Sequence, residues 1–306
     1  MTRTEDRNPI ESAPRWIVAV TGTYLCLGAL ALYVWSHAAP AFSMQASPGD
    51  AEALSVIAMA AAQTWLCVLV LRAFEPGAPL RRAWLLILLS AATHVAGGLL
   101  SQAPAAASLL NPTAPLGRAD QIHWTALLLS GPVQMALLAA GLLVALRILW
   151  RLGFWVRPKA TGWAVAGIVA LFTLPRFAAT AAGQFTAEGA ISLVRSLLLC
   201  VLSVEALFLW LSAARMGKGP IAKCWRAFAI GIFVIGFGEA AVWAIGSYCP
   251  GWLVAALEWY VWFPAVAVFA LAPAHTVAAV RRATGRVASS SSSLPVAGFP
   301  RTASAN

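Results

Sequence analysis

The sequence predicts an all-α, polytopic membrane protein with eight transmembrane helices, and three observations lead to this fold class. Of the 306 residues, 60% are hydrophobic and only 10% are charged, whereas a soluble domain carries about 25% charged residues. Apolar runs of about 20 residues recur along the chain, and this is the length that a helix needs to cross a bilayer core. Basic residues gather in alternate connecting segments, which is the pattern of cytoplasmic loops.

Eight segments meet the length requirement. Helices are expected because a strand of a membrane barrel shows only about ten residues of alternating pattern. The first segment starts near charged residues and is followed by small residues around His37–Ala41, as in a signal peptide, but its apolar run exceeds the roughly 7–15 residues of a signal-peptide core. We therefore expect it to be retained. The predicted spans are Trp16–Trp35, Ala53–Leu71, Ala83–Leu100, Trp124–Leu146, Thr161–Ala182, Ala190–Ala213, Trp225–Tyr248 and Trp252–Ala274.

The distribution of lysine and arginine predicts the orientation of these helices. With a cytoplasmic N-terminus, 18 of the 21 basic residues lie in cytoplasmic segments and one, Arg118, lies in an outer loop. The other two, Arg176 and Arg195, lie within helices. Because cytoplasmic loops of membrane proteins carry an excess of basic residues, both termini are predicted to be cytoplasmic, in a multi-pass protein of the cell (inner) membrane.

The two halves of the chain resemble copies of one four-helix unit. The sequence Arg82-Ala-Trp84 corresponds to Lys223-Cys-Trp225 at an offset of 141 residues, and His123-Trp124 corresponds to Glu258-Trp259 at an offset of 135. Four helices are an even number, so both copies enter the membrane from the same side and the repeat is parallel. The predicted organisation is a cytoplasmic N-terminal segment (1–15), two four-helix repeats (16–158 and 159–287) and a low-complexity, disordered cytoplasmic tail (288–306).

Ionisable side chains inside a bilayer are costly and are functional candidates by default. Most of those in the predicted helices lie toward the outer side of the membrane, and they would form a polar pocket open to that side. Arginine suits recognition of a carboxylate or phosphate because its planar group donates two parallel hydrogen bonds. The candidate ligand-binding residues are Arg176, Arg195, Glu239, Glu258, His94 and His123.

Each candidate also has a purely structural interpretation. The two arginines can pair with the glutamates and fix the register of the helices, and Arg195 can extend to the lipid headgroups. His123 can be an interfacial histidine beside Trp124. Glu205 lies apart from the other groups, and it needs either a partner of its own or a neutral carboxyl group, since burial disfavours the charged form.

The sequence favours no metal site and no cofactor. The five cysteines, Cys26, Cys67, Cys200, Cys224 and Cys249, are isolated and lack the spacing of metal ligands. His94 and His123 lie at different depths, which does not suit a haem held by two histidines. No lysine lies within a predicted helix, as a retinal Schiff base requires, and no catalytic motif occurs in the context that its chemistry needs.

These observations favour a protein that binds a small lipophilic or anionic ligand in an outer-side pocket, as a sensor, a carrier or an assembly module. The expected partners are the lipid bilayer and a membrane or cytoplasmic protein, and not nucleic acid. Two alternatives remain open: an intramembrane enzyme acting on a lipid-linked substrate, with His94 or His123 as the base, and a membrane anchor subunit of a quinone-linked complex.

Overall fold

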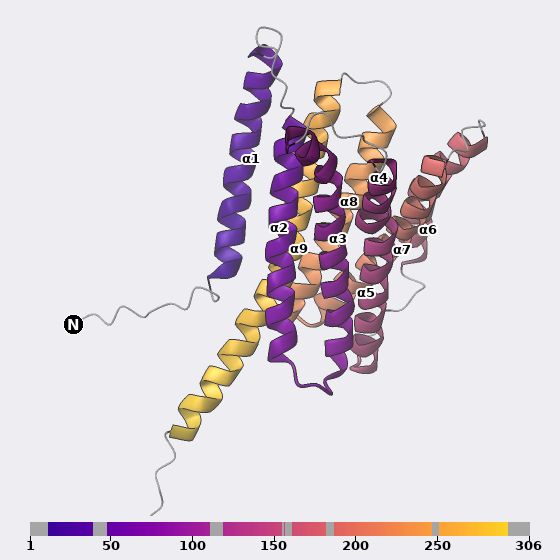
Figure 1. Cartoon of the computed structure of the whole chain (residues 1–306). Helices are drawn as coiled ribbons and strands as arrows, with labels where there is room; N and C mark the ends of the chain where they lie inside the picture. Colours follow the sequence, from indigo (N-terminus) through magenta and orange to yellow (C-terminus); the bar gives the residue numbers. More distant parts are fainter. Residues whose placement is uncertain are drawn as a thin grey trace, which may run out of the picture.

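The computed structural model describes residues 12–38, 48–110, 119–154, 156, 161–181, 187–246 and 251–292, and these residues form helices and turns without a strand. The helices follow one another along the chain (Figure 1), and α4, η1 and α5 are continuous with one another. Their bounds are α1 (Ala13–Ala38), α2 (Pro48–Ala73), α3 (Pro79–Leu110), α4 (Ala119–Leu128), the π-helical turn η1 (Leu129–Val133), α5 (Gln134–Arg151), α6 (Gly162–Ala181), α7 (Ala187–Arg215), α8 (Pro220–Gly246) and α9 (Gly251–Ser292).

Six helical stretches in the described part of the chain are long and apolar enough to cross a membrane, and α4, η1 and α5 together make one of them. This confirms the prediction of a helical, multi-pass membrane protein. The predicted spans Trp16–Trp35 and Thr161–Ala182 coincide with α1 and α6, whose side chains are described only in part, so their passage through the membrane stays a prediction. The six stretches are Leu54–Ala73, Pro79–Gln102, Gln121–Arg151, Gly189–Arg215, Pro220–Val242 and Tyr260–Arg281.

These six stretches pack into one bundle, with α2 and α5 each contacting a helix from the second half of the chain: α2 packs on α9, and α5 packs on α7. At the end of the bundle that carries the α2–α3 turn, the rings of Trp84 and Trp225 lie 6.2 Å apart, and Phe228 is 5.8 Å from Trp84. All three side chains are almost completely buried. Close-packed aromatic rings therefore fill this end of the bundle.

The helices α1 and α6 lie at the edge of the bundle. Helix α1 packs against α9, where the ring of Tyr24 stacks on Phe263 at 3.7 Å and the hydroxyl of Tyr260 donates to the carbonyl of Leu25. Helix α6 packs against α7 and leaves Trp163 almost fully exposed. Exposed indole rings at helix ends suit the interface between lipid and water.

The chain departs from the predicted spans at η1 and at the ends of α3 and α9, and α3 continues to Leu110, beyond the predicted end at Leu100. The predicted helix Trp124–Leu146 is interrupted by η1, because Pro132 has no N–H and cannot continue regular helical hydrogen bonding. At the other end of the chain, α9 continues to Ser292, so residues 288–292 are helical where a disordered tail was predicted. The alanines and arginines that precede this segment favour a helix. Residues 293–306 lie outside the described part of the chain.

Candidate functional site

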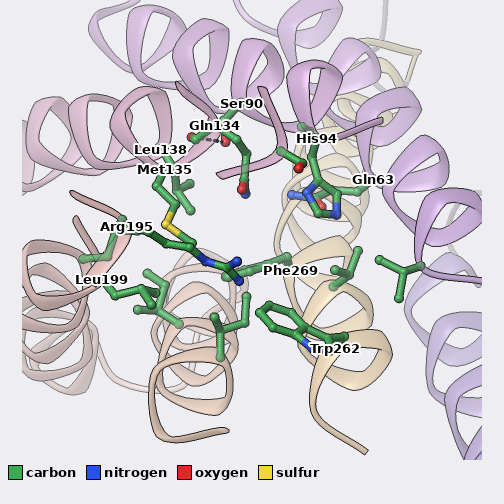
Figure 2. A pocket seen from close by; sticks show the side chains of 17 residues that line it. Gln63, Ser90, His94, Gln134, Met135, Leu138, Arg195, Leu199, Trp262 and Phe269 are labelled. Carbon is green, nitrogen blue, oxygen red and sulfur yellow. Dashed lines mark hydrogen bonds between the residues drawn. The ribbon is translucent and has the colours of Figure 1, made fainter. Parts of the chain in front are cut away.

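A cavity of about 490 Å³ lies in the middle of the bundle, between α2, α3, η1, α5, α7, α8 and α9 (Figure 2). Its size falls in the range of small-molecule sites in proteins, about 300–1,000 Å³. Most of its wall is apolar, with polar side chains at a few positions. The polar residues of the wall are Gln63, Ser90, His94, Ser130, Gln134 and Arg195, and the apolar ones are Val56, Ala91, Met135, Leu138, Leu199, Leu202, Ile232, Ile235, Trp262, Val266 and Phe269.

The cavity extends from the middle of the bundle toward the end opposite to the α2–α3 turn. Gln63 and Ser90 are central in the stretches Leu54–Ala73 and Pro79–Gln102, whereas Arg195 lies in the first third of Gly189–Arg215. The aromatic packing of Trp84 and Trp225 lies at the other end. The cavity is thus at membrane depth, displaced toward one surface of the bilayer.

The π-helical turn supplies part of the polar wall. In a regular helix the N–H of Gln134 would bond to the carbonyl of Ser130, but here it bonds to the carbonyls of Leu129 and Gly131. The side chain of His94 lies beside the backbone of Ser130 and interacts with it electrostatically. The irregular turn therefore frees the carbonyl that a histidine from the neighbouring helix can reach, and insertions of this kind are frequent at functional sites.

Two further contacts hold α3 against this turn. Ser90 donates a hydrogen bond of 2.9 Å to the carbonyl of Gln134. Gly97 lies so close to the turn that an added Cβ atom would be 2.6 Å from the backbone nitrogen of Ser130. A glycine is required for this approach because any larger residue would displace the backbone.

Arg195 joins the cavity to an ion pair. Its guanidinium donates to the carboxylate of Glu239 on α8, and its Cζ atom lies 5.3 Å from the centre of the Trp262 ring. Glu239 is not part of the cavity wall, whereas Arg195 is. The Nε atom of Arg195 is buried and has no hydrogen-bond partner among the described residues. Glu239 therefore compensates the charge of Arg195, and the guanidinium keeps one nitrogen without a partner among the described residues beside the cavity.

His94 reaches the same cavity from α3. Its Nδ1 atom is buried and has no hydrogen-bond partner in the described part of the chain. Arg195 is near enough to His94 to act on it electrostatically. In Figure 2, His94 and Gln63 lie on one side of the cavity and Arg195 extends into it from another wall. Buried polar atoms normally have partners, so these two unpartnered atoms point to a ligand.

The structure thus brings Arg195, Glu239 and His94 together, and it places His123 elsewhere. His123 is exposed, packs edge-on against Trp124 at 5.8 Å and does not line the cavity. Arg176 and Glu258 belong to the helices α6 and α9, but their side chains lie outside the described part of the structure.

Glu205 does lie apart from these residues, as expected. It is buried on α7 and outside the cavity wall, and its Oε2 atom has no hydrogen-bond partner among the described residues. No group of three or more histidine, cysteine and acidic residues in the described part of the chain could hold a metal ion.

Reasoning from charged residues missed the uncharged polar wall formed by Gln63, Ser90, Ser130 and Gln134. Amides and hydroxyls in the middle of apolar runs were the available signal, because each needs a hydrogen-bond partner within the membrane. Pro132 marked the interruption of the helix, but its sequence context did not show which carbonyls it would free.

Comparison with known proteins finds no matching family model, no similar curated protein and no similar solved structure. The function therefore has to be argued from the chemistry of the cavity itself.

Proposed function

We propose that this protein is an integral membrane protein of the inner membrane that binds a small lipophilic molecule in the central cavity, as a carrier, a sensor or an assembly module. The observation that carries the proposal is the cavity of about 490 Å³, which is lined by Arg195 and His94, each with a buried nitrogen that has no hydrogen-bond partner among the described residues. The basic residues of the sequence favour an orientation in which the cavity is nearer the outer surface.

The wall of the cavity restricts the chemistry of the ligand. Eleven of the 17 lining residues are apolar, so most of the ligand is expected to be apolar as well. Arg195 is a hydrogen-bond donor that already carries a counter-charge from Glu239. A ligand with a neutral or weakly acidic oxygen suits this donor better than a multiply charged anion does, since an uncompensated charge at this depth is costly.

We also propose that the cavity lies at the interface of a parallel 4+4 repeat. If α2, α3 and α5 correspond to α7, α8 and α9, the packing of α2 on α9 has its counterpart in the packing of α7 on α5. The corresponding residues Trp84 and Trp225 contact each other, as residues beside a two-fold axis would.

Close glycine contacts give independent support for the repeat. At the offset of 141 residues, Gly97 corresponds to Gly238, and at the offset of 135, Ala126 corresponds to Val261. A Cβ atom added at Gly97 would lie 3.0 Å from the carbonyl oxygen of Ala126, and one added at Gly238 would lie 2.3 Å from Val261 Cγ1. Corresponding glycines therefore pack against corresponding residues.

The repeat also relates polar and apolar residues of the cavity wall to one another. His94 corresponds to Ile235 and Gln134 to Phe269, and all four residues line the cavity. At these two pairs of positions, the first half of the chain contributes a polar group and the second half an apolar one. Such a site suits an amphipathic ligand, and sites between repeats at the middle of the membrane are common in carriers.

Mass spectrometry of small molecules that co-purify with the protein in mild detergent tests the binding proposal. The variant Ile235→Trp places a large side chain in the cavity, and we expect it to reduce the amount of the bound molecule by roughly tenfold or more. Ile230→Trp is the matched control, because Ile230 is an exposed residue of the same helix. Equal amounts of every extracted molecule in the wild type and in Ile235→Trp would contradict the proposal.

A further inference from the structure

A second hollow, of about 800 Å³, lies at the end of the bundle that carries the α2–α3 turn. It is formed by the end of α2, the connecting turn, the first turns of α3 and the last turns of α5. Its position is distinct from that of the central cavity, and the two sets of lining residues do not overlap. The lining residues are Leu71, Pro76, Gly77, Ala78, Pro79, Arg81, Arg82, Leu85, Val144, Arg147, Ile148 and Arg151.

Four arginines from two helices converge on this hollow. Arg81 and Arg82 come from the start of α3, and Arg147 and Arg151 come from the end of α5. The excess of basic residues in cytoplasmic segments explains why arginines occur at this end of the bundle. It does not explain why residues more than 60 positions apart in the sequence line one depression.

Among the described residues, the four positive charges have no counter-ion. In this part of the chain no acidic residue lines the hollow, and none of the four arginines forms an ion pair. Glu75, the acidic residue of the connecting turn, is exposed and is not part of the wall. An anionic ligand would therefore meet several guanidinium groups, which bind phosphate oxygens with paired hydrogen bonds.

The rest of the wall is apolar and continues onto the lipid-facing surface. Leu85, Val144 and Ile148 line the hollow beside the arginines, and Leu85 is 48% exposed. A phosphate group next to an apolar surface at the end of a membrane-spanning bundle has the chemistry of a phospholipid, and basic depressions between membrane helices are known sites for anionic lipids.

We propose that this hollow binds an anionic phospholipid, whose phosphate is held by Arg81, Arg82, Arg147 and Arg151 and whose acyl chains lie against Leu85, Val144 and Ile148. The site is independent of the ligand of the central cavity. It ties α3 to α5, the two helices that carry His94, Ser90 and Gln134 of the cavity wall.

Native mass spectrometry of the full-length protein tests this site, after incubation with phosphatidylglycerol or with phosphatidylcholine of the same acyl chains. The wild type is expected to retain phosphatidylglycerol roughly tenfold better than phosphatidylcholine. The double variant Arg81→Gln/Arg147→Gln should retain the two lipids about equally. The second pair, Arg82→Gln/Arg151→Gln, should behave in the same way and provides a test if one pair fails to fold.

The matched control is Arg72→Gln/Lys223→Gln, which removes two exposed basic residues from the same end of the bundle but outside the hollow. It should keep the preference of the wild type. An equal loss of preference in this control would overturn the proposal in favour of a general surface charge. Displacement of the lipid by millimolar inorganic phosphate would contradict a phospholipid as the ligand. Equal retention of both lipids by the wild type would contradict a site for anionic lipids.

Discussion

The guanidinium of Arg195 takes part in three interactions at once. It pairs with Glu239, lies against the ring of Trp262 and faces the central cavity. A cation at this depth needs compensation, since burying an unpaired charge is costly. Glu239 provides this compensation from outside the cavity, which leaves the cavity side of Arg195 able to donate a hydrogen bond.

This arrangement predicts strong coupling between Arg195 and Glu239 in the free energy of unfolding. Loss of either partner leaves an unpaired and partly buried charge at membrane depth, so Arg195→Ala and Glu239→Ala should each destabilise the protein by about 2–3 kcal/mol. The double variant should lose much less than the sum, with a coupling energy of about 2 kcal/mol. Thermal or denaturant unfolding in detergent, followed by tryptophan fluorescence, measures this double-mutant cycle.

The amount of co-purified molecule retained by the same variants separates the two roles of Arg195, as a partner of Glu239 and as a donor to the ligand. Glu239→Ala leaves the cavity donor in place, whereas Arg195→Ala removes it. Additive effects on stability would contradict the ion pair as a stabilising interaction. Equal retention of the co-purified molecule in both single variants would contradict the role of Arg195 as the donor to the ligand.

The sequence could predict the individual ionisable residues of the site. Arg195, Glu239 and His94 stand out because ionisable groups are rare in apolar runs. Their grouping in space could not be predicted from the sequence, because it depends on how α3, α7 and α8 rotate against one another. His123 illustrates this point, since its residue type is suitable but its side chain is exposed and does not line the cavity.

At the scale of the elements, η1 and α3 are in close contact with each other. The turn exposes the backbone of Ser130 to His94, and the contact requires Gly97 at the crossing point. Proline in a membrane helix is tolerated where neighbouring groups satisfy the freed backbone. Here two side chains of α3 meet the backbone of this region: Ser90 donates to the carbonyl of Gln134, and His94 lies beside Ser130.

The substitution Gly97→Ala is therefore expected to destabilise the protein by about 1–3 kcal/mol, because the new Cβ would lie 2.6 Å from a backbone nitrogen that cannot easily move. Gly167→Ala on α6 is the matched control. A Cβ at Gly167 meets nothing within 4 Å, and alanine favours a helix by up to about 1 kcal/mol. Unfolding midpoints of the two variants in detergent give the comparison, and equal midpoints would contradict the tight contact between α3 and η1.

The positions of the helices followed from the lengths of the apolar runs, and their approximate bounds agree with the six membrane-spanning stretches. The π-helical turn did not follow from the sequence. Pro132 indicates an irregularity, but a kink, a break and an inserted residue all relieve the same steric conflict. The choice among them depends on the partners that α3 provides.

At the scale of the whole molecule, side-chain contacts show at which end of the bundle each helix begins or ends. Trp84 near the start of α3 contacts Trp225 near the start of α8, so both helices begin at the same end of the bundle. Arg226 of α8 donates to the carbonyls of Ala213 and Gly217 at the end of α7. The C-terminus of α7 therefore also lies at this end, together with the arginines of α5 that line the second hollow.

Helices α5 and α7 both end at the arginine-rich end of the bundle, so α7 begins at the opposite end. The chain between α5 and α7 therefore has to cross from one end of the bundle to the other. Helix α6 is the segment that makes this passage, which is why we expect it to cross the membrane although its described apolar part, Gly162–Phe172, is short. From the positive-inside rule we expect the arginine-rich end to be cytoplasmic. If the number of crossings is even, both chain termini are then expected on that side.

Fusions with topology reporters test this arrangement. Green fluorescent protein fused after Ser289 should be fluorescent, and alkaline phosphatase fused at the same residue should be inactive, because both would be in the cytoplasm. After Leu110, at the end of α3, the phosphatase should be active and the fluorescent protein dark. The reverse result at both positions would contradict the orientation predicted from the arginines. The same result at both positions would contradict an odd number of crossings between them, and with it the passage of α6 through the membrane.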